Sequence, residues 1–445
     1  MNRWDEAEQR ARRAGDFYQR GQWAEALSEL QAAIDINPYN ASWHFNLGLT
    51  FEAMDRTDDA IAAYRRALEI EPHDMETLAA LGANHVKSQR FDEAIDFFDR
   101  VERIDPAFEP AYCHRIIAYA EKGLHDKAEE MFYLARQYKE ECPACYFNMG
   151  SSLFARGNYE KALWCWQRVT TIEPAYPCAN ARIAEAFWAK GQLGEAKAHF
   201  IEELRNNPGD LDTLLDLGEL LMELGDHRAA GEKFRQVLEL SPDEATAIFH
   251  LGQLALDEGD HVLALENFRR VLSLDRAFAG AHLKIAQIYL AQEDRSEAIF
   301  HGNCELAQQN LDVPLLVELG DLFMNLQQHG SARTAFDRAL AIQPQHAEAR
   351  HNLAVTLLLD GCIDEGIEQA KLALRTQPKF MLAMHNLALA YLTKRDFTRA
   401  RFFLREAMDI APDDPQLKTL QTKIKIAAFV HGVKNWPMKL LRRAR

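Results

Sequence analysis

The residues with the clearest capacity for chemistry are cysteines in the middle of the chain. Five of the seven are Cys113, Cys142, Cys145, Cys165 and Cys178, and two of these form the motif Cys-Pro-Ala-Cys. A C-x-x-C pair can supply half of a zinc site, and a thiol just before a helix N-terminus can have a lowered pKa. Cys113 and Cys178 are the expected additional ligands. The alternative interpretation is that these thiols are buried packing residues.

Two observations limit the metal and redox interpretations. The chain has no second C-x-x-C pair, and a thioredoxin-like motif needs a βαβ context. An odd number of cysteines in a long chain indicates reduced thiols rather than a disulfide framework. We therefore expect a cytoplasmic protein without a cofactor. A metal-responsive or redox-responsive adaptor stays open as an alternative function.

A second chemically distinct feature is the basic C-terminus. Residues 415–445 carry eight Lys and Arg and no acid, in a chain whose formal charge is −16. The acidic remainder is not expected to bind nucleic acid or anionic membranes. The tail also contains Trp436, Met438 and Leu441, so it could lie on an anionic membrane, bind nucleic acid, contact acidic residues elsewhere in the chain, or stay solvated. The first residues contain no apolar core of a signal peptide, and no apolar run is long enough to span a bilayer, so we expect an unexported protein.

These residues must be positioned by a 34-residue repeat that runs from Ala7 to Asp414. The repeat runs without insertion or deletion, so the twelve units begin at residues 7, 41, 75, 109, 143, 177, 211, 245, 279, 313, 347 and 381. The twentieth position is Ala in every unit except one, where it is Gly366, and the eighth is small in every unit except at Ile116. Small residues at both positions indicate two helices that cross closely. A proline near the end of most units stops the second helix.

This pattern resembles the tetratricopeptide repeat, a helix–turn–helix unit, over residues 7–414. The resemblance implies an all-α solenoid of stacked units in a right-handed superhelix. The first helix of each unit, helix A, would line a concave groove, and the second, helix B, would face outward. Residues 415–430 are apolar at helical spacing and are the expected capping helix. Residues 1–6 would be a lead-in, and residues 431–445 a basic tail.

Two units depart from the pattern. Unit four has Arg115 and Ile116 where Leu and a small residue are expected, which predicts looser or shifted packing. Unit nine has Gly302 in place of a large apolar residue and Glu305 in place of a small one, which predicts a weak second helix. The departures in unit nine are either tolerated drift or a hinge near 300–312.

The resemblance also predicts which side chains point into the groove, and it divides them into four sets. Aromatic rings of units one to six could hold apolar side chains of a partner, and acids of units seven to ten should attract basic segments. Leucines of units eleven and twelve need a cover. Asparagines at the sixth position would hydrogen-bond the backbone of an extended peptide, as in peptide-binding members of the family, or are simply tolerated on a solvated helix face. The predicted groove residues are Phe147, Phe154 and Trp188; Asp212, Asp216, Glu219, Glu223, Asp257, Glu318 and Asp321; Leu358, Leu389 and Leu392; and Asn46, Asn148, Asn352 and Asn386 with Arg182.

The function that follows is protein binding rather than catalysis. The sequence has no Walker loop, zinc-protease helix signature or dinucleotide fingerprint, and the repeats leave no room for a catalytic domain of ordinary size. A chaperone-type carboxylate clamp is rejected because Cys113, Ile117 and Cys178 stand where the clamp needs Lys, Asn and Lys. We predict a non-enzymatic scaffold or adaptor that binds basic or amphipathic segments of other proteins. The alternative is a subunit that attaches partners to a membrane or nucleic acid through the basic tail.

Overall fold

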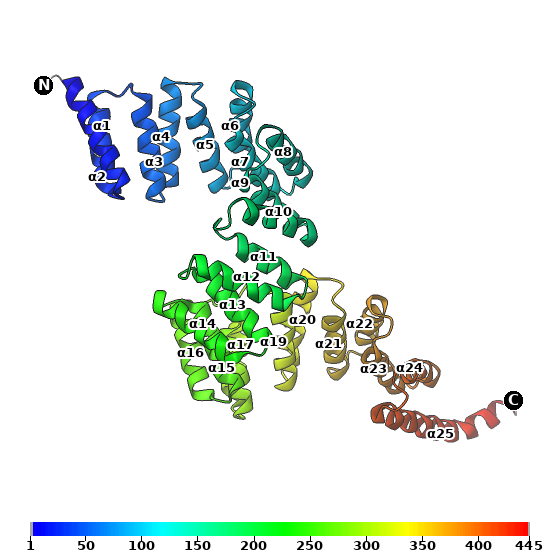
Figure 1. The fold of residues 1–445 in the computed structure, drawn as a ribbon. Helices are drawn as coiled ribbons and strands as arrows, with labels where there is room; N and C mark the ends of the chain where they lie inside the picture. The colour runs from blue at the N-terminus through cyan, green and yellow to red at the C-terminus, as the bar shows by residue number, and fades with distance from the viewer. Residues whose placement is uncertain (1–2, 444–445) are drawn as a thin grey trace. The chain divides into compact units, whose positions relative to one another are not determined.

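The computed structural model describes residues 3–443, with side chains described through His431, and within these residues every regular element is a helix (Figure 1). The predicted all-α fold of helix pairs is confirmed. By packing, the chain divides into two compact halves, one up to Lys233 and one from Phe234 onward. The predicted handedness of the superhelix stays a prediction.

The helices follow the 34-residue period, with odd numbers for helix A and even numbers for helix B of each unit. The first half contains α1 Arg3–Gln19, α2 Trp23–Ile36, α3 Ala41–Ala53, α4 Thr57–Ile70, α5 Met75–Lys87, α6 Phe91–Ile104, α7 Glu109–Glu121, α8 His125–Tyr138, α9 Pro143–Ala155, α10 Tyr159–Ile172, α11 Ala179–Ala189, α12 Leu193–Asn206 and α13 Leu211–Glu223. The boundary between the halves lies inside α14 His227–Leu240. The second half contains α15 Ala245–Asp257, α16 His261–Leu274, α17 Ala281–Ala291, α18 Arg295–Leu306, α19 Val313–Asn325, α20 His329–Ile342, α21 Ala347–Leu359, α22 Ile363–Thr376, α23 Met381–Thr393, α24 Phe397–Ile410 and α25 Pro415–Arg443.

Helix A ends in the same way in all twelve units. The fifteenth residue of each unit has a left-handed backbone, with φ between 56° and 81°. In seven units this residue is Gly, which adopts φ > 0 without steric cost, whereas Asp55, Gln89, Glu293, Gln327 and Arg395 adopt it in the others. This residue ends helix A and sends the chain back antiparallel as helix B.

The small residue at the eighth position is explained by an aromatic ring from helix B of the same unit. A Cβ added to Gly48, Gly82, Gly150, Gly252 or Gly320 would come within 2.3 to 2.8 Å of the ring of Tyr64, Phe98, Trp166, Phe268 or Phe336, respectively. These five aromatic residues are fully buried. The predicted close crossing of the two helices is therefore confirmed at these units.

A matched pair of alanine substitutions tests this crossing. Gly320→Ala should lower the free energy of unfolding by about 1–3 kcal/mol, because the new methyl group overlaps the buried Phe336 ring. Gly330→Ala on α20 should leave stability unchanged or raise it by about 0.5 kcal/mol, because no atom lies within 4 Å of the added Cβ. Urea denaturation followed by circular dichroism measures both. Equal effects of the two changes would show that the crossing is not tightly packed.

Unit four accommodates its unusual residues by burying them. Ile116 is fully buried in the same core as Phe132 of α8. Arg115 is also buried, with its guanidinium between the carboxylates of Asp99 and Glu102 from α6. The helices α7 and α8 keep ordinary lengths, and the described core around them continues from unit to unit.

Unit nine uses its unusual residues in specific contacts. Its second helix, α18, is shorter than the other B helices, and Gly302 lies against Phe323 of the next unit, with 3.1 Å from an added Cβ to the ring. Glu305 is fully buried and accepts hydrogen bonds from the backbone N–H groups of Gly280 and Leu283 at the start of α17. One core cluster includes Ala298, Leu311 and Val313, on both sides of the hinge predicted near 300–312. That hinge stays a prediction.

At the C-terminus, α25 begins where the capping helix was expected and continues beyond residue 430 to Arg443. Leu417, Leu420 and Ile424 are buried in a core shared with α23 and α24. At the N-terminus, α1 begins at Arg3, so the expected lead-in is already part of the first helix from that residue on. No helix of the described residues is both long and apolar enough to cross a bilayer.

Candidate functional site

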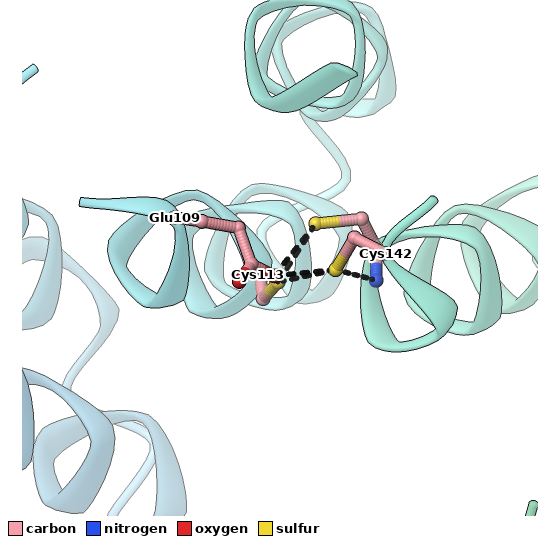
Figure 2. Close-up of side chains that lie close together, drawn as sticks. Glu109, Cys113 and Cys142 are labelled. Carbon is pink, nitrogen blue, oxygen red and sulfur yellow. Dashed lines mark hydrogen bonds between the residues drawn. The ribbon is translucent and has the colours of Figure 1, made fainter. Parts of the chain in front are cut away.

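The strongest chemical grouping joins helix A of unit four to helix A of unit five. Glu109 and Cys113 lie one turn apart on α7, and Cys142, just before the start of α9, faces them (Figure 2). Cys145, in the first turn of α9, joins the same group. The Cys113 Sγ is 2.7 Å from the Cys145 Sγ and 3.5 Å from the Cys142 Sγ. The Glu109 Oε1 is 3.2 Å from the Cys113 Sγ and 2.5 Å from the Cys142 Sγ. The four ligand atoms all lie within 4.8 Å of one another.

The local sequence explains why the two α9 cysteines face α7. Cys142 is the N-cap of α9 and Pro143 occupies the first helical position, where a proline costs no hydrogen bond. The backbone N–H of Cys145 donates to the Cys142 Sγ at 3.2 Å, which replaces the usual oxygen cap. All three cysteines are buried, whereas Glu109 is half-buried. The helix start therefore fixes both sulfurs on the side that packs against α7.

The electrostatics of the group favour one thiolate. Hydrogen bonds from the Cys113 and Cys145 thiols lower the pKa of Cys142, and the N-terminus of α9 also favours a negative charge there. Hydrogen bonding with Cys142 and Cys145, together with burial, raises the pKa of Cys113. The Lys139 Nζ lies 3.2 Å from the Glu109 Oε2, so the lysine ammonium forms an ion pair with the carboxylate oxygen that does not contact the sulfurs.

Sequence reasoning found three members of this group and missed the fourth. Glu109 could have been found because it precedes Cys113 by four residues, which places both on one face of a helix. Cys178, expected as a ligand, lies elsewhere as the exposed N-cap of α11, with φ of 62°. Among the described side chains, no other set of three or more Cys, His, Asp or Glu residues places its ligand atoms so close together.

A pocket of about 550 Å³ lies beside this group, and it brings together three of the predicted groove residues. Asn148 and Phe154 of α9 line it with Arg182 of α11. Helix α7 contributes Ile117 and Glu121. The A helices of units four, five and six therefore supply most of the lining of one pocket.

Two polar residues of the pocket already have partners in the protein. The Asn148 Nδ2 donates to the Cys113 backbone carbonyl at 3.0 Å, and the Arg182 Nη1 donates to both carboxylate oxygens of Glu185 at 2.8 Å. Phe147 is half-buried against Tyr176, with 5.3 Å between the ring centroids. A ligand in this pocket would contact the Phe154 ring and compete with Glu185 for the guanidinium.

Acids cluster next to Arg182 on α11 and α13. Asp212, Asp216, Glu219 and Glu223 lie on α13, and the Trp188 Nε1 of α11 donates to the Glu223 Oε2 at 2.6 Å. Burial, together with the negative charges of Glu185, Glu219 and Asp212, raises the pKa of Asp216 to about 7 against the opposing effect of Arg182. The predicted acidic zone of the first half is thus a single cluster.

In the second half, the predicted acids have neighbours of their own. Glu318 on α19 lies 3.3 Å from the Lys284 Nζ, and the Asp321 Oδ1 accepts from the Asn352 Nδ2 at 2.9 Å. Burial raises the pKa of Asp321 to about 6, with Glu348 adding to the effect. Asp257 is exposed at the end of α15.

The remaining predicted groove residues are dispersed. Asn46 is exposed on α3 beside a small pocket with Tyr18, and the Asn386 Oδ1 of α23 lies 3.3 Å from the His385 Nδ1. Leucines expected to lie open are half-buried: Leu358 packs on the C-terminal core, Leu389 shares a pocket with Leu420 of α25, and Leu392 shares one with Ile426 and Val430. Side chains beyond His431, including Trp436, Met438 and Leu441, lie outside the described residues.

Family models of the tetratricopeptide repeat match most of the chain. They match residues 16–55, 51–115, 181–245, 245–278, 317–379 and 383–414. The chain belongs to the tetratricopeptide repeat family. The resemblance inferred from the 34-residue period is thereby confirmed.

Individual tetratricopeptide repeat (TPR) proteins resemble parts or all of this chain. A TPR repeat-containing thioredoxin, TTL4, of Arabidopsis thaliana is 28% identical over 103 residues, which are 23% of this chain and 15% of that protein. The match therefore spans well under a fifth of that relative's length.

Solved structures resemble the chain in fold. Yeast Tom70 is 13% identical and aligns over 99% of both chains with a TM-score of 0.44. YrrB, described as a TPR protein with an unusual peptide-binding site, is 23% identical and covers 43% of this chain and 99% of its own, with a TM-score of 0.39. A TPR protein from Parabacteroides merdae is 17% identical over 56% of this chain and 98% of its own, with a TM-score of 0.49.

Proposed function

We propose that this TPR protein is a non-enzymatic adaptor that binds extended, basic segments of partner proteins on the A-helix face of units four to seven. The observation that carries the proposal is the acidic cluster beside the pocket. Asp212, Asp216 and Glu219 stand with Glu185 around a single Arg182. Partly buried charges of one sign favour a ligand of the opposite sign and are screened less than exposed ones.

The pocket adds a second determinant of specificity. The Phe154 ring is half-buried in it and offers an apolar contact, and the Asn148 side chain keeps its carbonyl oxygen for a ligand backbone while its amide holds the Cys113 carbonyl. A segment with one apolar side chain followed by Lys or Arg fits these neighbouring features. The odd number of cysteines supports placing the protein in the cytoplasm.

Charge reversal tests the proposal. Asp212→Lys with Asp216→Lys and Glu219→Lys should weaken binding of a fluorescent basic amphipathic peptide on the order of tenfold, measured by anisotropy. The matched control reverses three exposed acids near the B helices, Glu130, Glu173 and Glu195, with the same change in net charge. If both variants lose the same affinity for the peptide, the binding is a nonspecific attraction that depends on net charge alone.

The same titration at two pH values distinguishes Asp216 from its neighbours. Its pKa is about 7, so the carboxyl is mostly neutral at pH 6 and mostly negative at pH 8. A basic peptide should therefore bind about threefold more tightly at pH 8, because it gains an ion pair. Asp216→Asn should remove most of this pH dependence. An affinity that is independent of pH in the wild type would contradict a role for Asp216.

A further inference from the structure

We infer that Glu109, Cys113, Cys142 and Cys145 bind one zinc ion that joins units four and five. The inference begins from the composition of the group, which is three thiols and one carboxylate converging from two helices within 4.8 Å. Zinc takes such ligands in tetrahedral sites, with about 2.3 Å to sulfur and about 2.0–2.2 Å to oxygen. A redox pair needs only two sulfurs, so it would not explain why the third thiol and the carboxylate lie beside them.

The distances between the four ligand atoms are close to those of a zinc site, so small side-chain movements would admit the ion. Two sulfurs bound to one zinc ion lie about 3.8 Å apart, given the bond length and tetrahedral geometry. Cys113 and Cys142 are already 3.5 Å apart, and Cys145 lies 4.0 Å from the Glu109 Oε1. The Cys113 to Cys145 separation of 2.7 Å and the Cys142 Sγ to Glu109 Oε1 separation of 2.5 Å must each open by about 1 Å, which small rotations of the side chains provide.

Neighbouring groups hold the ligands in orientations that suit a metal. The Lys139 Nζ binds the Glu109 Oε2, so the other oxygen, Oε1, is directed toward the sulfurs as a single ligand atom. The Cys145 N–H donates to the Cys142 sulfur. Such contacts orient ligands and tune metal affinity.

The ligand set also indicates the kind of metal and its role. Three thiolates favour a thiophilic ion such as zinc over calcium or magnesium, which prefer oxygen. Four protein ligands fill a tetrahedral site and leave no position for a substrate, so the role is structural rather than catalytic. The ion would link α7 to α9 at the junction where unit four has Glu140 in place of the usual terminal proline.

A metal at this position would also support the neighbouring pocket. Cys113 supplies the sulfur to the group and its backbone carbonyl to the Asn148 side chain, which lines the pocket. Metal binding, however, is measured without any peptide, so its outcome is independent of the proposed binding function.

The first experiment measures metal in the full-length protein purified under reducing conditions without chelator. Elemental analysis should give about one zinc per chain. Replacement of zinc by Co²⁺ should produce the intense visible bands and sulfur-to-metal charge-transfer absorption of a tetrahedral thiolate site. Glu109→Gln and Cys145→Ser should each lower zinc affinity at least tenfold in competition with a chromophoric chelator, and Lys139→Ala should lower it about tenfold.

The matched control is Cys165→Ser, because Cys165 is buried in the same core but lies outside the ligand group. It should keep one zinc per chain. Circular dichroism identifies variants that fail to fold. If a cysteine variant does not fold, the zinc affinity of Glu109→Gln still tests the site, because Glu109 is only half-buried. The inference is overturned if folded wild-type protein takes up neither Zn²⁺ nor Co²⁺ after reduction. A disulfide between Cys113 and Cys145 that persists in freshly isolated, metal-free protein would overturn it as well.

Discussion

Glu305→Ala should lower the free energy of unfolding of the second half of the chain by about 3 kcal/mol. The Glu305 side chain is fully buried, and its two oxygens accept the backbone N–H groups of Gly280 and Leu283 at 2.8 and 3.0 Å. Alanine would leave both donors buried without a partner, at about 1–3 kcal/mol each. Glu305→Gln should recover part of the loss, because its amide keeps one acceptor oxygen.

The measurement is urea denaturation, combined with hydrogen exchange at the Gly280 and Leu283 amides. Glu297→Ala is the control, since Glu297 is exposed on the same helix and its loss should change stability by no more than about 0.5 kcal/mol. If Glu305→Ala and Glu297→Ala denature alike, the buried carboxylate does not stabilise the start of α17.

The same arrangement in unit six provides an independent test in the first half. The Glu203 oxygens accept the backbone N–H groups of Cys178 and Asn180 at 3.0 and 3.1 Å. In both units, helix A is short and follows a residue with positive φ, Cys178 or Gly280. Glu203→Ala should therefore cost about as much as Glu305→Ala.

The stability of the protein should depend strongly on the two acids that contact the buried Arg115 and much less on Arg115 itself. The Arg115 Nη2 lies 2.8 Å from the Asp99 Oδ1, and the Nη1 lies 2.5 Å from the Glu102 Oε2. Asp99→Asn combined with Glu102→Gln leaves the buried guanidinium without a counter-charge and should cost about 3 kcal/mol. The Arg115 Nε already lacks a hydrogen-bond partner among the described residues.

Arg115→Leu should cost less than 1 kcal/mol by the same reasoning. Most other units have an apolar residue at this position, and Asp99 and Glu102 stay about one-third exposed, so water can solvate them when the guanidinium is gone. Thermal and urea denaturation of the two variants give the comparison. If Arg115→Leu lowers the stability more than the double acid variant does, the unpaired guanidinium is not the costly buried charge.

The fold could be predicted from the sequence because its signals are local and repeated. The small eighth residue and the aromatic ring above it recur in unit after unit, and so does the residue that ends helix A. The 34-residue period, together with the family resemblance that it carries, therefore predicted the helix pairs.

The candidate sites were harder to predict because they depend on contacts between units. Glu109 joins the cysteines only when α7 packs on α9, and Glu305 was interpreted as a weakness of its own helix although it caps a different one. The extent of α25 was also missed, since Pro437 disfavours a continuous helix over residues 431–443. Asn148 fits the expected ligand-binding pattern in sequence, yet part of its side chain holds the Cys113 carbonyl.

The left-handed residue at the end of helix A has a consequence for how such a gene can change in length. All twelve units reverse direction through nearly the same backbone angle, whether the residue is Gly or a charged or polar one. A deletion or duplication of 34 codons that starts at this point in one unit and stops at the same point in another recreates an intact turn. Since each repeat depends chiefly on its nearest neighbours, recombination within the gene would lengthen or shorten the protein by whole units while the remaining turns keep their geometry.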